Sequence, residues 1–462
     1  MRHCFRLLLV INIVVVLFST GCKSKNDVVA PVRDSLGKIN QWIYDSMGYY
    51  YYWSSTMPAQ PDYSLAPQLF FTSLQHKDDR FSSITNRADI GGKKSTFSYY
   101  GFHYSIVRHS VSGAYIGVVT YAAAETPAYR AGLRRGVYFT AVDDSTLSAE
   151  SITWANERLS SGKTVGITPA TWQNNAWVKE EPVSFASSYI DENPVVLTKY
   201  FSHNGVKTGY LFYNHFVEGY DVLLLDAFAK LKQENVQECI IDLRYNPGGS
   251  VASCAKMLGM LTTVTENSVF GIFVGNAGWG RQVYNMSRIL KTSTSASGAT
   301  VPELAAHRLN LKRVFILTSR ATASAAELLV NNLKPYLPVV QLGDTTMGKD
   351  EAGFQVADPR NPRQVEWVLQ VIVYKLLNSA GNGSYHTGIV PARLVSELSA
   401  FPLAAIGAAD DPLIAEALMQ IYGSHTIEEG LLRRKKTPVY PVYVSSGADA
   451  AGAPVVQIDR PH

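Results

Sequence analysis

The sequence is poor in cysteine and lacks any cysteine–histidine spacing typical of a metal site. It has four cysteines in 462 residues, and two of them, Cys4 and Cys22, lie near the N-terminus. Cys239 lies in an apolar run expected to form a strand, and Cys254 lies in an expected helix. Both are therefore expected to be buried free thiols rather than a disulfide. Neither a metal nor a cofactor is expected.

Charged residues are also scarce. Asp, Glu, Lys and Arg make up 17% of the chain, and the formal net charge is +4. The one dense basic run, Arg433–Lys436, is interpreted as a solvated surface turn, so nucleic-acid binding has little support. A hydrophobic fraction of 46% is typical of a globular protein. The length predicts two or three domains.

A hydrophobic run stands apart at the N-terminus. Leu7–Phe18 follows a start that contains Arg2 and Arg6, a pattern typical of a secretory signal and too short for a membrane span. Small residues then lead to Cys22, which resembles a bacterial lipoprotein signal, although Ser19 stands where leucine is usual. The resemblance implies that Cys22 is lipidated and that the protein is exported and anchored in the cell envelope, in the outer membrane on its periplasmic or surface face. A plain signal peptide cleaved nearby is the alternative.

Changes in the residue pattern divide the rest of the chain. Ile39, Ile43 and Met47 recur at helical spacing, short alternating runs follow, and alternating strands and helices then indicate an α/β core. The predicted segments are a signal peptide at 1–22, a polar tether at 23–34, a helical subdomain at 35–90, a β-rich domain at 95–188, an α/β catalytic domain at 195–420 and a tail at 421–462. Residues 264–310 are interpreted as an insertion over the core, and the tail is expected to form no clear element.

One string in the β-rich region resembles a PDZ domain. The string is Thr126–Gly136, with Val137 in place of the customary aspartate and Asp143–Asp144 in place of Asn-Gly. PDZ domains bind peptide tails by strand addition and hold the terminal carboxylate on loop amides. The resemblance implies that the loop around Gly132 and Leu133 takes part in binding a protein tail. A β-rich linker domain is the alternative.

A serine and a lysine occur in a pattern suited to acyl transfer. Ser324 follows an apolar strand and opens an apolar helix, and Lys349 lies in a glycine turn. A serine becomes a nucleophile when a base lies beside it, and a buried lysine with a lowered pKa can be that base. Asp350 and Glu351 adjoin this lysine and would favour its charged form. If Lys349 is the base, they are therefore expected to point outward.

Backbone amides near the serine could hold an oxyanion. The turn Asn246–Gly249 follows another strand, and its glycines let the backbone approach a substrate closely. Gly248 or Gly249 and the amide of Ala325, at the helix N-terminus, would supply the donors. Taken singly, the serine is more often a helix cap, and the lysine and the glycines are surface turns. The prediction rests on their order within one domain.

Three segments together resemble the carboxy-terminal processing (tail-specific) serine peptidases. They are Asp242–Gly249 (Asp-Leu-Arg-Tyr-Asn-Pro-Gly-Gly), Thr322–Glu327 (Thr-Ala-Ser-Ala-Ala-Glu) and Gly343–Lys349 (Gly-Asp-Thr-Thr-Met-Gly-Lys), and Gly388–Ala392 matches a fourth. The resemblance places the family's nucleophile at Ser324 and its lysine at Lys349. It implies an α/β core of the ClpP/crotonase type with an inserted PDZ-like domain and an N-terminal helical subdomain.

One position departs from that pattern. The family often has a glutamine four residues after the lysine, which orients the lysine, but this position is Gly353 here. Gln355 lies two residues further on. Either a bulge lets Gln355 serve as the orienting residue, or catalysis uses a dyad of Ser324 and Lys349. We slightly favour the dyad.

The resemblance implies a serine endopeptidase of the cell envelope that cleaves proteins near their C-termini through an acyl-enzyme. Its partners would be proteins with exposed C-terminal tails and, through the lipid anchor, a membrane. The alternative is a non-catalytic envelope scaffold that binds protein tails. An acyl-CoA enzyme with a crotonase-like core is disfavoured, because CoA substrates are cytosolic and the chain carries an export signal. The sequence leaves the oligomeric state open.

Overall fold

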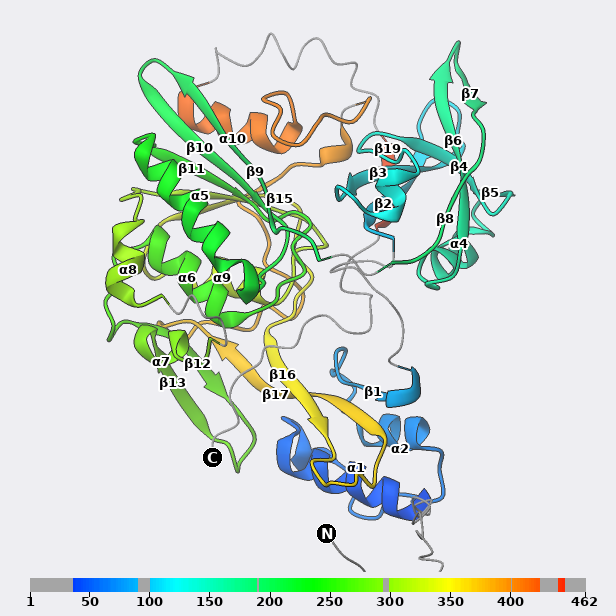
Figure 1. Ribbon diagram of the computed structural model, residues 1–462, viewed down its shortest axis with the longest axis vertical. Helices are drawn as coiled ribbons and strands as arrows, with labels where there is room; N and C mark the ends of the chain where they lie inside the picture. The colour runs from blue at the N-terminus through cyan, green and yellow to red at the C-terminus, as the bar shows by residue number, and fades with distance from the viewer. Residues whose placement is uncertain are drawn as a thin grey trace, which may run out of the picture.

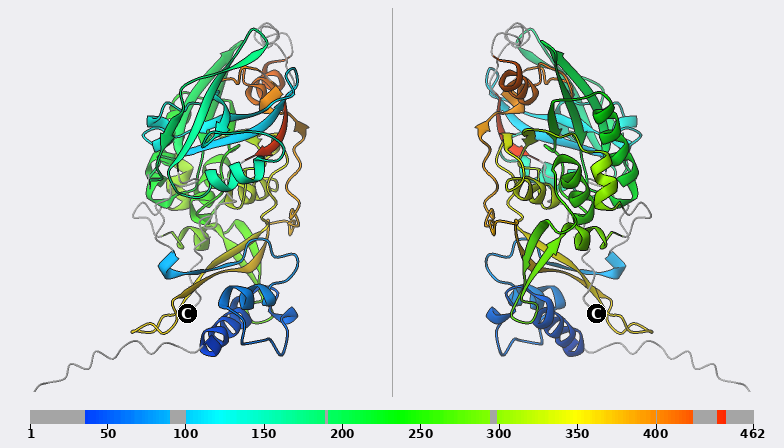
Figure 2. Two further views of the ribbon diagram at one scale, coloured as in Figure 1. Left: turned by 90° about the vertical axis from the view of Figure 1, so that its right-hand side faces the viewer. Right: turned by 90° about the vertical axis from the view of Figure 1, so that its left-hand side faces the viewer.

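The computed structural model describes residues 36–89, 100–188, 191–293, 299–399, 401–423 and 439–444. The expected signal peptide, tether and lipidated Cys22 lie outside these residues. An α/β region occupies the left of Figure 1, a β-rich region lies beside it, and the N-terminal helices lie at one end. The side views place these helices at the far end from the β9–β10 pair (Figure 2). Among the described residues, no helix is long and apolar enough to cross a membrane.

A six-stranded sheet forms the centre of the α/β region. Its order is β18-β15-β14-β11-β10-β9, and every neighbouring pair is parallel except the antiparallel β9–β10 pair. The strands are β9 (Val195–His203), β10 (Val206–Tyr213), β11 (Glu238–Asp242), β14 (Val314–Thr318), β15 (Val339–Gly343) and β18 (Arg393–Leu394). Helices α5 (Asp221–Gln233), α6 (Val251–Leu261) and α9 (Ala325–Leu333) pack with one face, and α10 (Pro412–Tyr422) packs with the other. This arrangement confirms the α/β class.

The central strands are apolar on both faces. In β11, Cys239 and Ile241 belong to the hydrophobic cluster on the α6 and α9 side, and Ile240 belongs to the cluster on the α10 side. A parallel strand covered on both faces needs such a continuous apolar run. Cys239 and Cys254 are buried and free, which confirms the expectation for both thiols.

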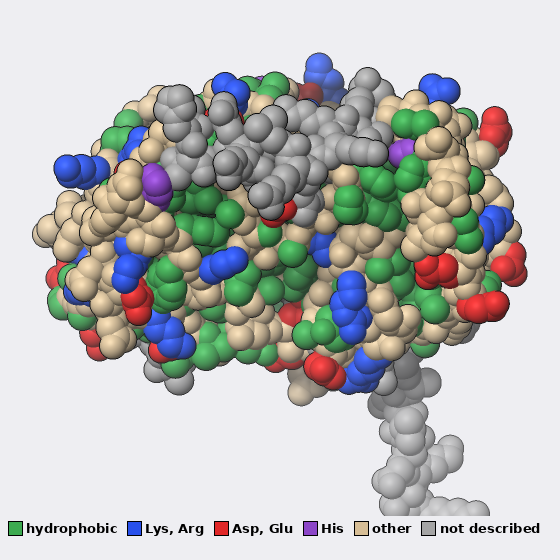
Figure 3. Space-filling model, turned by 90° about the horizontal axis from the view of Figure 1, so that it is seen from above, with side chains coloured by type: hydrophobic (Ala, Val, Ile, Leu, Met, Phe, Trp, Pro, Cys, Tyr) green, Lys and Arg blue, Asp and Glu red, His purple; other side chains and the backbone are tan. Residues whose placement is uncertain are grey.

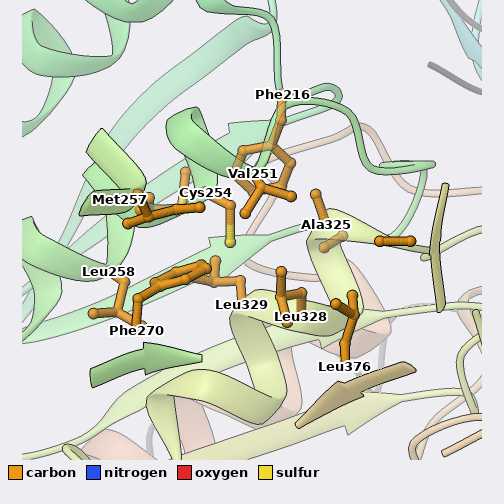
Figure 4. Close-up of a cluster of buried hydrophobic side chains, with 14 of the residues drawn as sticks. Phe216, Val251, Cys254, Met257, Leu258, Phe270, Ala325, Leu328, Leu329 and Leu376 are labelled. Carbon is orange, nitrogen blue, oxygen red and sulfur yellow. The ribbon is translucent and has the colours of Figure 1, made fainter. Parts of the chain in front are cut away.

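The start of α9 rests on this hydrophobic core. Figure 4 shows Ala325, Leu328 and Leu329 of α9 packed with side chains from neighbouring elements. The labelled neighbours are Phe216, Val251, Cys254, Met257, Leu258, Phe270 and Leu376. The residue that precedes Ala325 is thereby held at a fixed place above a close-packed interior.

A second sheet has five strands with antiparallel pairings. It consists of β1 (Ser83–Asn86), β12 (Val269–Val274), β13 (Arg281–Asn285), β16 (Glu351–Ala357) and β17 (Trp367–Leu377), with α7 (Met286–Leu290) and α8 (Val301–Ala306) following β13. The interpretation of 264–310 as an insertion over the core is therefore wrong. Phe270, Phe273 and Met286 are buried in the main hydrophobic cluster, so the segment is part of the core despite its polar connections.

The N-terminal helices join the same core. They are α1 (Leu36–Tyr50) and α2 (Pro67–Leu74), with single turns η1 (Ser54–Thr56) and η2 (Arg87–Asp89); η3 (Glu218–Tyr220) and η4 (Glu397–Ser399) lie later in the chain. Ile43 and Met47 are fully buried, as their helical spacing predicts. The backbone N–H of Tyr52 donates to the carbonyl of Ile372 on β17 at 2.9 Å, which ties this region to the second sheet.

The β-rich region has its own hydrophobic cluster and an eight-stranded sheet. Its elements are β2 (Phe102–His109), β3 (Tyr115–Ala122), α3 (Pro127–Arg130), β4 (Tyr138–Val142), β5 (Ser145–Thr146), α4 (Ile152–Leu159), β6 (Val165–Gln173), β7 (Ala176–Lys179), β8 (Val183–Phe185) and β19 (Val439–Val444). Seen from above, basic and acidic side chains are interspersed over the described part of the molecule's upper face (Figure 3). A single-sign basic face is absent from the described part of this view.

The expectation that the tail forms no clear element is wrong, because Val439–Val444 forms β19. This strand pairs antiparallel with β2, from Val439 opposite His109 to Val444 opposite Ser105. Without β19, β2 would be an edge strand with unpaired backbone groups, which readily accepts another strand. The run Val-Tyr-Pro-Val-Tyr-Val is rich in strand-forming residues.

Candidate active site

Ser324 lies in a strained turn directly before α9. Its backbone angles are φ 55° and ψ −119°, a conformation that residues other than glycine rarely adopt. Its side chain is only 3% exposed. An ordinary helix cap has extended backbone angles, so the capping interpretation alone does not account for this geometry. Strain of this kind clusters at active sites, and nucleophilic serines of other hydrolases occupy comparable turns.

The glycine turn after β11 lies directly against Ser324. A Cβ atom added to Gly248 would stand 2.7 Å from the Cβ of Ser324 and 2.8 Å from the backbone nitrogen of Ala325. The φ of Gly248 is +105°. Because neither the space nor the backbone angle admits a side chain, glycine is required here.

The two glycine amides differ in their hydrogen bonds. The N–H of Gly248 donates to Oδ1 of Asn246 at 2.8 Å. The N–H of Gly249 has no hydrogen-bond partner among the described residues. With the amide of Ala325 at the start of α9, Gly249 is thus the better candidate to bind an oxyanion.

A buried carboxylate joins the serine turn to the lysine turn. Oε2 of Glu327 accepts hydrogen bonds from the backbone N–H groups of Ser324 at 2.9 Å and Lys349 at 2.8 Å. Its Oε1 accepts from Oγ1 of Thr346 at 2.5 Å and the N–H of Gly348 at 2.6 Å. Glu327 is the last residue of the motif Thr322–Glu327, and the motif alone predicted no role for it. The Ser-x-x-Glu spacing of a capping box was the signal that could have found it.

Lys349 is half-buried, and its Nζ lies 5.1 Å from the centre of the Phe81 ring. Burial lowers the pKa of the Lys349 amine below its ordinary value. The carboxylates of Glu351, Glu327 and Asp79 oppose this shift, in that order of strength. The Nζ of Lys349 makes no hydrogen bond with any described residue, Ser324 included. Catalytic hydrogen bonds are often long in a site without substrate.

The expectation that Asp350 and Glu351 point outward is wrong. Both side chains are only 3% exposed. Nζ of Lys375 on β17 donates to Oδ1 of Asp350 at 3.0 Å and to Oε1 of Glu351. Lys375 therefore holds both carboxylates inside the protein, because a buried carboxylate needs a cation or hydrogen-bond donors. As a result, Lys349 lies beside negative charge that the sequence analysis assigned to solvent.

Comparison with known proteins gives the family of this site. Residues 207–395 match the model of peptidase family S41, and residues 38–83 match the model of the peptidase S41 N-terminal domain. The chain belongs to peptidase family S41.

Two relatives agree with this assignment. The crystal structure of a putative S41 protease from Bacteroides fragilis is 25% identical to this chain, with a TM-score of 0.65, and the alignment covers 83% of this chain and 97% of that one. The carboxy-terminal processing protease CtpB of Bacillus subtilis is 21% identical over 290 residues, or 60% of this chain. That match spans 53% of the CtpB sequence, about half its length.

The region matched as the S41 N-terminal domain contacts the lysine turn directly. An Nη2 atom of Arg80 donates to the carbonyl oxygens of Gly348 at 2.6 Å and His386 at 2.7 Å. Arg80 therefore fixes the backbone immediately before Lys349 from outside the α/β region. Its position in a polar segment gave no signal of this role.

The predicted orienting residue of this S41 member, Gln355, lies on the strand that follows Lys349. Gln355 is exposed on β16, opposite Gln370 of β17. The expected irregularity does occur, between Ala352 and Gly353. However, no hydrogen bond joins Gln355 to Lys349, two residues that the structure describes. The exposed side chain of Gln355 gives no support to an orienting role, which stays a prediction.

The remaining predicted site residues lie elsewhere. Gly132 ends α3 with a φ of +92°, and the side chain of Leu133 is 1% exposed within the core of the β-rich region. Leu133 thus packs within this core, and the part of this loop in tail binding stays a prediction. Within the described residues, no group of three or more His, Cys, Asp or Glu side chains could hold a metal ion.

Proposed function

We propose that this S41 member is a serine endopeptidase that cleaves protein substrates near their C-termini. The observation that carries the proposal is the buried bridge at Glu327. One carboxylate oxygen binds the backbone of both Ser324 and Lys349, so the nucleophile and its base are held as one unit. A helix capping box accounts for the bond to Ser324, but the second bond, to Lys349, goes beyond a helix cap or a surface turn.

The chemistry follows from this arrangement. Ser324 Oγ attacks the carbonyl carbon of the substrate and transfers its proton to the neutral amine of Lys349. The resulting ammonium group then protonates the leaving amine as the peptide bond breaks. Lys349 next takes a proton from water, and the hydroxide hydrolyses the acyl-enzyme. The lowered pKa of Lys349 supports its role as the base, since burial disfavours the ammonium form.

The oxyanion of each tetrahedral intermediate would lie between two backbone amides. The N–H of Gly249 is without a partner among the described residues, and the N–H of Ala325 lies at the start of α9, where the helix dipole favours negative charge. Such preorganised donors lower the barrier because they need no reorganisation during the reaction.

We infer that the β-rich region is PDZ-like and presents substrate tails by strand addition at β2. The observation in support is that β2 already accepts an antiparallel strand, β19, from the chain's own tail. Strand addition supplies main-chain hydrogen bonds with little regard to sequence, which suits a protease with varied substrates. A substrate tail at this edge would compete with Val439–Val444.

We further propose that the protein is exported and held in the bacterial cell envelope through a lipid on Cys22. The basic start, the short apolar run and the small residues before Cys22 support this proposal. The polar residues 23–34 would then separate the folded protein from the membrane. Mass analysis of the membrane fraction for a diacylated N-terminal cysteine tests it.

Digestion of an unstructured protein by residues 23–462 tests the proposed activity. Wild type should release products from the C-terminal end, whereas Ser324→Ala and Lys349→Ala should not. Lys334→Ala is the matched control, because Lys334 is an exposed lysine at the other end of α9 and should leave activity unchanged. Equal digestion by wild type and either active-site variant would overturn the dyad.

The same preparation distinguishes the alternative of a tail-binding scaffold. A scaffold would bind C-terminal peptides with wild-type affinity and show no cleavage even with prolonged incubation. Peptide binding measured by fluorescence anisotropy, beside the digestion, separates the two functions.

A further inference from the structure

One buried polar atom beside the proposed base lacks a hydrogen-bond partner among the described residues. The side chain of Glu351, at the start of β16, is 3% exposed. Its Oε1 accepts from Lys375, but its Oε2 is buried and has no hydrogen-bond partner in the described part of the chain. Nζ of Lys349 equally has no acceptor there. Burying an unpaired carboxylate oxygen costs free energy, so such an atom calls for a functional explanation.

The other carboxylates that act on Lys349 are fully engaged. Glu327 uses both oxygens for four hydrogen bonds to the serine and lysine turns. Asp79 accepts from the N–H groups of Phe81 and Ser82 through Oδ1 and from a tyrosine hydroxyl through Oδ2. Of these carboxylates, Glu351 therefore alone retains a free, buried oxygen. It also exerts the strongest charge effect on Lys349.

We propose that Glu351 is the positioning residue of Lys349 and takes the place of the glutamine that the family pattern puts at position 353. This proposal rests on the proposed function. In the substrate complex, Oε2 accepts a hydrogen bond from Nζ of Lys349, a bond that is not formed in the structure described here, and so orients the amine toward Ser324. When Lys349 takes the proton of Ser324, an O–H bond breaks and an N–H bond forms, and the carboxylate stabilises the resulting ammonium ion. An aspartate supports the imidazolium of serine–histidine proteases in the same way.

The surroundings of Glu351 make its charge sensitive to pH near neutrality. Burial raises the pKa of Glu351 to about 7, Lys375 lowers it, and Asp350 and Asp79 raise it. The titratable groups that face Glu351 are Lys349, Asp350, Lys375, Asp79, Tyr51 and Tyr385. Because Lys349 and Glu351 interact, their protons leave in steps that belong to the pair. The fraction of Lys349 that is neutral at a given pH therefore depends on the protonation of both side chains.

A titration without any proteolysis tests the pairing. The Lys349 amine is followed by carbon NMR of ¹³C-lysine in the Ser324→Ala protein, and its signal is assigned by its loss in Lys349→Arg. In Glu351→Gln the pKa of Lys349 should fall by about one unit or more, because a negative neighbour is removed. Asp350→Asn is the matched control: it removes one charge from the same Lys375 pair, and Asp350 has no resolved effect on Lys349. Equal shifts in the two variants, or no shift in Glu351→Gln, would overturn the proposal.

Kinetics of the active enzyme separate positioning from a purely structural role. Glu351→Gln keeps an acceptor and loses the charge, so the acidic limb of the kcat/KM profile should move to lower pH. Glu351→Leu loses both the hydrogen-bond acceptor and the charge, so it should reduce kcat at least about tenfold and leave KM little changed. Glu351→Asp should restore part of the loss. A purely structural role would instead lower the melting temperature of all three Glu351 variants and leave the acidic limb of the pH profile in place.

The NMR titration and the digestion also separate the two proposals. If the NMR shift appears but wild type cleaves nothing, the pairing of Glu351 with Lys349 stands and the proposed function fails.

Discussion

Two buried clusters of charge in this protein differ in how completely their groups are paired. The first surrounds Arg244, whose side chain is fully buried with Asp242 and Asp411. Arg244 donates to both oxygens of Asp411 at 2.8 and 2.9 Å and to Asp242 at 3.0 Å. The second surrounds Lys349, whose amine has no hydrogen-bond partner among the described residues.

The Arg244 cluster also connects regions of the chain. Arg135, in the β-rich region, donates to Glu397 at 3.0 Å, to Asp411 at 3.3 Å and to the hydroxyl of Tyr245 at 2.7 Å. Tyr245 in turn donates to Glu397. Every member therefore has a partner of opposite charge or a hydrogen bond, which describes a structural network.

We infer from this difference that the Arg244 cluster serves structure and that the Lys349 cluster serves the proposed chemistry. Paired charges hold the β-rich region, β11 and the start of α10 in one arrangement. The Lys349 amine has no hydrogen-bond acceptor among the described residues, and Oε2 of Glu351 has no donor there, so these two atoms add no pairing to the fold. Such groups are retained where their protonation can change during a reaction. Variants of the two clusters should therefore separate stability from activity.

The largest expected effect is on activity, in the Lys349 cluster. Lys349→Met should lower kcat/KM by at least about 10⁴-fold, because the base is lost. The melting temperature should stay the same or rise, since a poorly paired buried amine has been removed. Parallel measurement of kcat/KM and thermal unfolding checks both parts. A marked loss of stability would contradict the distinction between the clusters.

The opposite result is expected in the paired cluster. Arg244→Met should reduce the free energy of unfolding by about 3–5 kcal/mol, because Asp242 and Asp411 lose their cation. Urea unfolding of the variant beside wild type measures this loss. If Arg244→Met unfolds at the wild-type midpoint, the cluster is not the structural network described above.

An intermediate effect is expected at the glycine that touches Ser324. Gly248→Ala should reduce kcat by roughly 10²–10³-fold, because the added Cβ would displace Ser324 or the amide of Ala325. Gly205→Ala, in the turn between β9 and β10, is the control, since Gly205 also has a positive φ but open space around it. The control variant should show the backbone strain of the added Cβ without the contact with Ser324, so its kcat should stay near that of wild type. Similar kcat values in the two variants would show that the contact with Ser324 is unimportant.

The Lys349 cluster, through Glu351, should also make the free energy of unfolding depend on pH. The folded pKa of Glu351, about 7, is above its ordinary value of 4.5. Folding therefore favours the protonated form, and this contribution to stability is present at low pH and is lost as pH rises through about 7. Urea unfolding at pH 5 and pH 8 should show Glu351→Gln gaining about 1–3 kcal/mol relative to wild type at the higher pH. A constant difference would mean that Glu351 has an ordinary pKa.

The smallest expected effect concerns the β-rich region. A chain ending at Gly423 lacks β19 and frees the edge of β2, so tail peptides should bind several-fold more tightly. Anisotropy with a labelled peptide measures this affinity, and the Arg244 cluster should keep the rest of the fold unchanged. Unchanged affinity would indicate that tails bind elsewhere.

Much of the fold could be predicted from local patterns. Cys254 lies in a helix, Val251–Leu261, and Cys239 lies in a strand, Glu238–Asp242, as the local sequence predicts. These segments follow from hydrophobic periodicity alone. The place of residues 264–310 and of β19 depends on pairing with strands far away in the chain, which local patterns do not contain.

The candidate site, like the fold, could be predicted only where local sequence carries the information. The motifs indicated Ser324, Lys349 and the glycine turn, and the structure brings the three segments together. The inward position of Glu351 was missed because its partner, Lys375, is on another strand. The role of Arg80 was missed for the same reason, since its carbonyl partners are 268 and 306 positions away.

Acylation of the enzyme by an activated p-nitrophenyl ester tests the central claim most directly. Intact-mass analysis should show one acyl group, and peptide mapping should place it on Ser324. The rate of acylation should rise with pH as Lys349 loses its proton, and Lys349→Met should abolish the adduct. An acyl group on another residue, or equal acylation of Ser324 in Lys349→Met, would contradict the assignment of Lys349 as the base.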